Sequence, residues 1–138
     1  MNQLLRLSPP AGIALRIQDA VPTPHELPLS VALESAGDPA ALVFWRSADS
    51  SICGIFHGLG RTAWPHARLR RLHAVVIRPG AGPGVTGLEL VLEDGAELPL
   101  LVVRPYREEF ANWLETEMGT IGRFLEVEMR WKDYGLDR

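Results

Sequence analysis

The segment 88–102 carries the pattern that most restricts how this chain can fold. Apolar residues occupy every second position of residues 88–92 and again of residues 98–102, and Asp94-Gly95 lies between the two runs. A period of two is typical of a strand with one buried face, and an Asp-Gly pair suits a two-residue type I′ turn. The sequence therefore predicts an antiparallel hairpin.

Five further strands are expected before this hairpin. They are recognised by alternation of apolar and polar residues or by short apolar runs bounded by turn-forming residues. Pro28 has no backbone N–H, so its strand is expected at a sheet edge or begins after the proline. Residues 58–65 are expected to form a loop. The expected strands are residues 13–18, 27–34, 41–46, 52–57 and 69–78, of which the third and fourth are expected to pair.

An amphipathic helix is predicted for residues 106–125. Pro105 suits the start of a helix, and Glu108 and Glu109 place carboxylates in its first turn, where they favour the helix N-terminus. Apolar residues then recur three or four positions apart and form one face. They are Phe110, Trp113, Leu114, Met118, Ile121, Phe124 and Leu125. Residues 126–132 fit a strand or a continued helix, and their alternation favours the strand.

Together these elements predict an α+β fold that is mainly antiparallel. About seven strands would form a curved sheet, arranged as a sandwich or a partly open barrel, which the C-terminal helix closes. A length of 138 residues, 46% of them hydrophobic, suits a single domain that spans residues 1–138. No apolar run approaches the roughly 20 residues of a membrane span, and no signal peptide is recognised. We expect a cytoplasmic protein, or one attached peripherally to a membrane.

From about residue 68 to residue 127, the order of elements resembles the C-terminal part of small bacterial pleckstrin-homology-like domains. The resemblance rests on residues 72–78, on the hairpin 87–103 with its Asp-Gly turn, and on residues 110–127. It implies a pleckstrin-homology-like architecture and no shared catalytic residues. The chain departs from that family because residues 1–60 supply additional strands and no transmembrane hairpin precedes the resembling part.

Charge is distributed unevenly along the chain. The net charge is −3, yet residues 50–88 contain five arginines and no acidic residue. Arg61, Arg68 and Arg70, with Trp64 beside them, would form a basic rim that binds an anionic surface or an acidic partner. In the alternative interpretation, Arg68, Arg70 and Arg78 only pair with the glutamates around the hairpin turn, Glu89, Glu93 and Glu97.

No motif predicts a catalytic residue, a metal site or a cofactor. Cys53 and His57 lie about 13 Å apart if they share one strand, so Cys53 is expected to be a small core residue. The spacing of His57, His66 and His73 matches no common metal-ligand pattern. The glycine-rich segment 80–87 lacks the lysine and helix N-terminus of a phosphate-binding loop, and a flexible connection is expected instead.

These observations favour a binding or adaptor domain without enzymatic activity. It would use the basic rim or an apolar groove to engage a protein or an anionic membrane surface. Two alternatives remain, a small enzyme or ligand carrier with a pocket inside the sheet, and a homo-oligomeric structural protein that pairs exposed strand edges. The acidic isoelectric point, near 5.8, and the lack of a base-stacking motif argue against nucleic acid as a partner.

Overall fold

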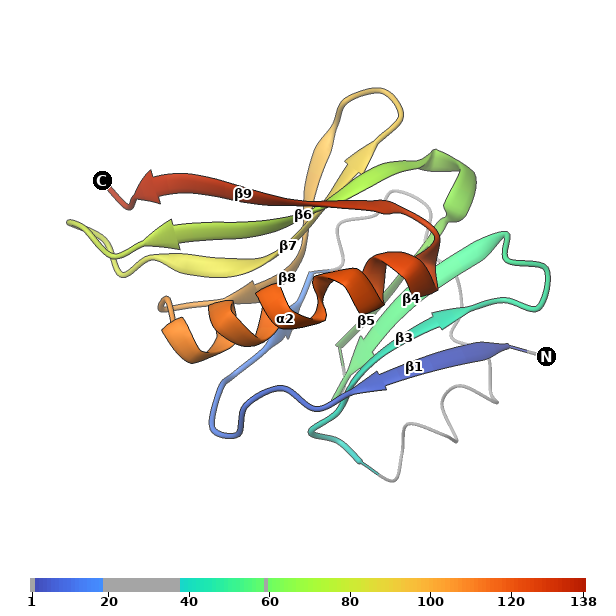
Figure 1. The fold of residues 1–138 in the computed structure, drawn as a ribbon, viewed down its shortest axis with the longest axis horizontal. Coiled ribbons are helices and arrows are strands. Elements are labelled where there is room, and N and C mark those ends of the chain that lie inside the picture. The colour runs from blue at the N-terminus through green and yellow to red at the C-terminus, as the bar shows by residue number, and fades with distance from the viewer. Residues whose placement is uncertain (1, 19–37, 59) are drawn as a thin grey trace.

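Two β-sheets and one helix make up the described part of the chain (Figure 1). The computed structural model describes residues 2–18, 38–58 and 60–138. Most strand pairs are antiparallel and the helix is C-terminal, so the predicted α+β class is confirmed. These described residues contain nine strands, where the sequence suggested about seven.

The four-stranded sheet is fully antiparallel, and two of its strands were predicted. Val43 lies opposite Phe56 and Arg46 opposite Cys53, which confirms the expected pairing of residues 41–46 with residues 52–57. In spatial order the sheet contains β1 (Gln3–Leu7), β3 (Leu42–Arg46), β4 (Ile52–His57) and β5 (Gly60–Pro65).

The prediction of a loop at residues 58–65 is wrong. Gly58 adopts a positive φ of 58°, and His57 pairs directly with Gly60, so a tight turn leaves room for the whole of β5. Strand β1 was not expected either, because its five residues show little alternation. The expected strand 13–18 is reduced to the two residues of β2 (Arg16–Ile17), and the expected strand 27–34 lies outside the described residues.

The five-stranded sheet contains the predicted hairpin. Its spatial order is β2, β8 (Glu97–Val103), β7 (Val85–Leu92), β6 (Leu69–Arg78) and β9 (Glu128–Leu136). Strand β9 confirms the strand interpretation of residues 126–132, and it runs parallel to β6. A parallel pair needs a long crossover connection, and the helix is part of the connection here.

The hairpin is confirmed, but its turn differs from the expected type. Leu92 N–H donates to Ala96 O, and Gly95 N–H donates to Leu92 O, so three residues form the loop. Gly95 has a φ of 89°, whereas Asp94 keeps a negative φ and its carboxylate accepts a hydrogen bond from Ala96 N–H. A type I turn followed by a left-handed glycine explains this loop better than a type I′ turn.

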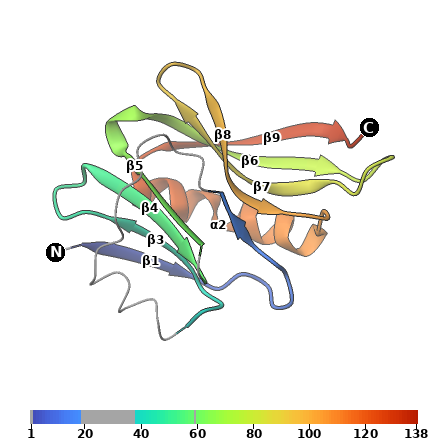
Figure 2. The ribbon, with the colours of Figure 1, turned by 180° about the vertical axis from the view of Figure 1, so that it is seen from behind.

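The helix α2 (Glu108–Leu125) begins two residues later than expected and packs on both sheets. Figure 1 shows it in front of the strands, and in the reverse view of Figure 2 β2 and β8 lie in front of it. Fully buried side chains from α2 and both sheets form one core, as predicted for the apolar helix face. They include Phe110, Leu114, Ile121, Leu125, Phe44, Trp64, Leu72 and Leu90.

Candidate functional site

The arginines of the predicted basic rim are spread along the chain rather than gathered. Arg61 is exposed near the start of β5, whereas Arg68 follows the end of that strand in the 3-10 helix η1 (His66–Arg68). From Arg61 to the end of β5 the chain extends about 13 Å, at roughly 3.3 Å per residue. Arg70 is exposed at a bulge of β6, so it lies in a different element from Arg68.

Trp64 cannot contribute to an exposed rim because its side chain lies in the core. Its exposed fraction is 0%, and it packs with the buried residues of both sheets. The neighbouring His66 is also occupied, since its Nε2 lies 3.0 Å from Leu125 O at the C-terminal end of α2. Arg46 Nη1 donates to Phe124 O at 2.5 Å at the same end. These polar side chains satisfy helix carbonyl groups that have no partner within the helix.

The arginines of β6 contact other groups than the expected glutamate carboxylates. Arg70 Nη2 donates to the backbone oxygen of Glu93 at 2.6 Å. Arg78 forms an ion pair with Asp133 of β9, and the hydrogen bond raises the pKa of Arg78 and lowers that of Asp133. For Arg70 and Arg78, the alternative interpretation was therefore right that they have structural partners, but wrong about which groups these are.

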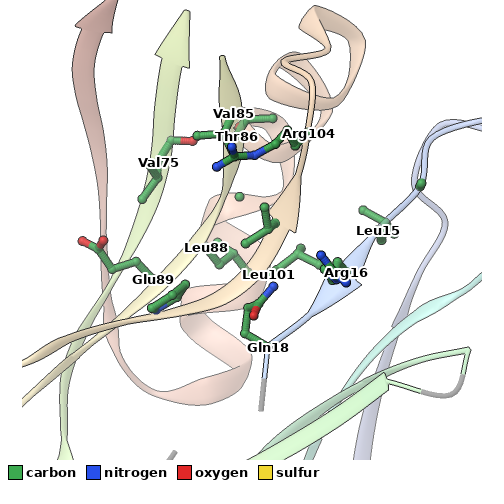
Figure 3. Close-up of a pocket in the computed structure, with 14 residues that line it drawn as sticks. Leu15, Arg16, Gln18, Val75, Val85, Thr86, Leu88, Glu89, Leu101 and Arg104 are labelled. Carbon is green, nitrogen blue, oxygen red and sulfur yellow. The ribbon is translucent and has the colours of Figure 1, made fainter. Parts of the chain in front are cut away.

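A cavity of about 760 Å³ lies on the face of the five-stranded sheet that points away from α2 (Figure 3). We call it the outer-face pocket. Its apolar surface comes mainly from half-buried or exposed aliphatic residues of three strands and of the residue before β2, namely Val75, Val85, Pro99, Val102 and Leu15. Two exposed arginines border it, Arg16 from β2 and Arg104 directly after β8, and Gln18 adds an amide.

Gly87 explains why this face of the sheet is hollow. A Cβ atom built on Gly87 would lie 1.8 Å from the carbonyl oxygen of Leu101, so only glycine permits the observed approach of β8 to β7. The register between these strands shifts between Leu88 and Glu89, which indicates a bulge in β8. A bulge bends its strand and strengthens the local twist. The missing side chain and the bend together leave space beside β2.

A polar cluster of three residues, His73, Glu89 and Tyr134, borders the pocket on the side of β6 and β9. His73 Nδ1 lies 2.8 Å from Glu89 Oε1, and Tyr134 Oη donates to the same oxygen at 3.2 Å. Partial desolvation, followed by the Glu89 charge, raises the pKa of Tyr134 to about 12, so the phenol keeps its proton at neutral pH. In Figure 3 the Glu89 carboxylate points toward β6, on the opposite side of the pocket from Arg16.

Sequence reasoning did not identify the outer-face pocket. Arg16 and Arg104 were not singled out, and Glu89 was considered only as a partner of the arginines. One signal was present, because Gly87 interrupts an alternating strand, and an interior glycine often marks a close backbone approach. The partners of Glu89 depend on strand pairing that no local pattern reveals.

Cys53 and the histidines occupy separate structural positions. Cys53 is buried, which raises its pKa to about 11, so it remains a protonated thiol and the prediction of a core residue is confirmed. His57 Nδ1 lies 3.0 Å from Ala41 O, and His66 and His73 have other partners, Leu125 O and Glu89. Within the described ranges, no group of three or more His, Cys, Asp or Glu side chains is arranged to hold a metal ion.

No family model, curated protein or solved structure matches this chain. Among the described residues, no helix is long and apolar enough to cross a membrane. The assignment of a site therefore rests on the geometry of the chain itself.

Proposed function

We propose that this chain is a binding domain whose site is the outer-face pocket and whose ligand carries an anionic group. One observation carries the proposal: Arg16 and Arg104, from separate elements, border an apolar cavity of about 760 Å³. Neither guanidinium forms a hydrogen bond or ion pair with any residue that the structure describes. Two cations that have no partner among the described residues, beside an apolar surface, favour a ligand that combines an anionic group with an apolar part.

The chemistry of the two arginines suits this role. A guanidinium group presents a planar set of donors that matches a carboxylate or phosphate and keeps its charge at any physiological pH. The volume also falls within the range of about 300–1,000 Å³ that is typical of small-molecule sites. The site differs from the basic rim favoured by the sequence, and it differs from the alternative of a pocket inside the sheet because the cavity lies on the outer face.

Of the functions inferred from the sequence, this proposal is nearest to the ligand carrier, and it keeps the single domain and the absence of a proposed enzymatic activity. The basic rim is replaced by Arg16 and Arg104, since the arginines of residues 61–70 are dispersed and partly engaged. The pleckstrin-homology-like resemblance and the cytoplasmic location remain parts of the proposal. A C-terminal helix packed on two mainly antiparallel sheets is compatible with that architecture.

The fluorescent anion 1-anilinonaphthalene-8-sulfonate tests the proposal, because its emission rises when it enters an apolar site. We expect the double variant Arg16→Ala/Arg104→Ala to bind this probe at least tenfold more weakly than wild type, from the loss of two charge-assisted contacts. The matched control is Arg68→Ala/Arg70→Ala, which removes the same charge outside the pocket and should bind as wild type does.

Circular dichroism should verify that both variants are folded. Equal fluorescence of wild type and the pocket variant, whether strong or absent, would contradict the proposed site. A loss of binding confined to the Arg68→Ala/Arg70→Ala variant would instead support the basic rim that the sequence suggested.

A further inference from the structure

The surface of the outer-face pocket restricts the shape of the apolar part of a ligand. Val75, Val85 and Val102 belong to three adjacent strands and are each partly exposed beside the cavity, and Leu15 closes its β2 side. None of the described lining residues is aromatic. Sites for planar ligands such as nucleobases commonly stack them on aromatic side chains. An aliphatic surface without rings is better suited to a flexible hydrocarbon chain.

The charges around the pocket restrict the polar part of the ligand. Arg16 and Arg104 are exposed, so a group bound between them keeps contact with water while its apolar part enters the cavity. The acidic lining residue, Glu89, is already engaged by His73 and Tyr134 and is directed toward β6 (Figure 3). Among the described lining residues, the charges without a partner are therefore both positive, and they lie away from that carboxylate.

We infer that the outer-face pocket binds an aliphatic chain that ends in a single anionic head group, which Arg16 and Arg104 hold at the protein surface. This inference rests on the proposed function and narrows its ligand class. The chemistry is shared by free fatty carboxylates and by alkyl phosphates, so the head group is left for the experiment to distinguish. Each methylene that enters the cavity should raise the affinity about fourfold, from about 0.8 kcal/mol per buried CH₂.

Isothermal titration calorimetry with butanoate, hexanoate and octanoate, all below their micelle concentrations, measures this dependence directly. We expect the affinity to rise by roughly fourfold per methylene through the series. Acetate, which has the charge without the chain, and 1-octanol, which has the chain without the charge, should each bind at least tenfold more weakly than octanoate. Octyl phosphate is titrated in the same way as octanoate. The tighter binder of the two shows whether the natural head group is a phosphate or a carboxylate.

A substitution that fills the cavity tests its location. Val75→Phe should weaken octanoate binding at least tenfold while leaving acetate binding unchanged. Ile77→Phe is the matched control, because Ile77 lies two residues along β6 on the same face but does not line the pocket. If thermal unfolding shows that Val75→Phe does not fold, Val85→Phe on the neighbouring strand serves the same purpose.

The outcomes separate the two proposals. Octanoate that binds no tighter than acetate or octanol, while the sulfonate probe still depends on Arg16 and Arg104, would overturn the aliphatic ligand and leave the anion site intact. Octanoate binding that is equally strong in Val75→Phe, Val85→Phe and Ile77→Phe would also overturn the inference. If the probe itself is insensitive to both arginines, the proposed function fails as well.

Discussion

The two faces of the five-stranded sheet are built from the same strands but contain different chemistry. On the inner face, Leu72, Ala74 and Leu90 are completely buried against α2 and the rest of the core. On the outer face, the alternate residues His73 and Val75 contribute to the polar cluster and to the outer-face pocket. Since successive residues of a strand point to opposite faces, β6 serves both surfaces. Substitutions on the inner face should therefore change stability, and substitutions on the outer face should change binding.

The largest effect is expected where α2 covers the inner face. Phe110→Ala removes a fully buried ring that packs beside Trp113, and we expect a loss of about 3–5 kcal/mol in the free energy of unfolding. Urea denaturation followed by circular dichroism measures it. The control is Asn112→Ala, at an exposed position of the same helix, which should change stability by less than about 0.5 kcal/mol. Similar stability of both variants would show that α2 is not packed as described.

A smaller loss of stability is expected when a side chain is added at Gly87, which lines the outer-face pocket. Gly87→Ala forces β7 and β8 apart, because the new Cβ would collide with Leu101 O, and overpacking of this kind typically costs about 1–3 kcal/mol. Gly119→Ala is the matched control in α2, where the nearest atom is a flexible arginine nitrogen 3.1 Å away. It should stabilise the chain by up to about 1 kcal/mol. Opposite signs in thermal unfolding would confirm the distinction, and two stabilising substitutions would contradict the close approach.

The smallest effect on stability is expected in the polar cluster, where it is best measured as a function of pH. Partial burial and the neighbouring Glu89 charge raise the pKa of Tyr134 to about 12, above the value near 10 of an exposed tyrosine. The protonated phenol is favoured by the fold, so its stabilising contribution is complete below about pH 10 and is lost as the pH rises through about 12. Glu89→Gln removes the charge but keeps the size of the side chain.

Ultraviolet absorbance of tyrosinate reports this titration. Tyr134→Phe identifies the contribution of Tyr134, because the chain has two tyrosines. We expect Glu89→Gln to lower the pKa of Tyr134 part of the way toward 10 and to leave the unfolding temperature nearly unchanged. A titration curve identical to that of wild type would show that the carboxylate does not act on Tyr134, and the described cluster would be incorrect.

Elements with a strong local pattern of apolar residues were predictable from the sequence. The hairpin of β7 and β8 follows from alternation on both sides of Asp94-Gly95, and α2 follows from apolar residues three or four positions apart. The turn type was missed because the Asp94 side chain accepts a hydrogen bond from Ala96 N–H and holds a three-residue loop. A dipeptide does not specify the loop length by itself.

The candidate site was much less predictable than the fold. Arg16 and Arg104 are far apart in sequence and border the same cavity only because β2 pairs with β8 at Arg16 and Val102. The polar cluster likewise needs β9 beside β6, a parallel arrangement that the hydrophobic pattern does not specify. The alternative pairing of Arg78 with a glutamate of the hairpin was therefore wrong, although the strands of Arg78 and Glu89 were placed correctly.

The glycine-rich connection after β6 also has contacts that the local sequence pattern does not predict. It was expected to be flexible, but Gly84 N–H donates to the Asp137 carboxylate at 2.9 Å, and Gly82 N–H donates to Asp137 O at 3.1 Å. The C-terminal end of the chain thus anchors this loop, and a Cβ at Gly82 would collide with that carboxylate. Composition alone identified a turn-rich segment and gave no indication of its distant partner.

By itself, the amino-acid sequence determined which residues form most of the strands and the helix, and which sides of them are apolar. This information is local, because side-chain direction repeats every two residues in a strand and every 3.6 in a helix. Only the tertiary structure decided which strands are neighbours, that Trp64 is buried, and that Arg16 and Arg104 border one cavity. The physical reason is that strand order depends on burying all apolar faces together in one core, whereas each segment specifies only its own face.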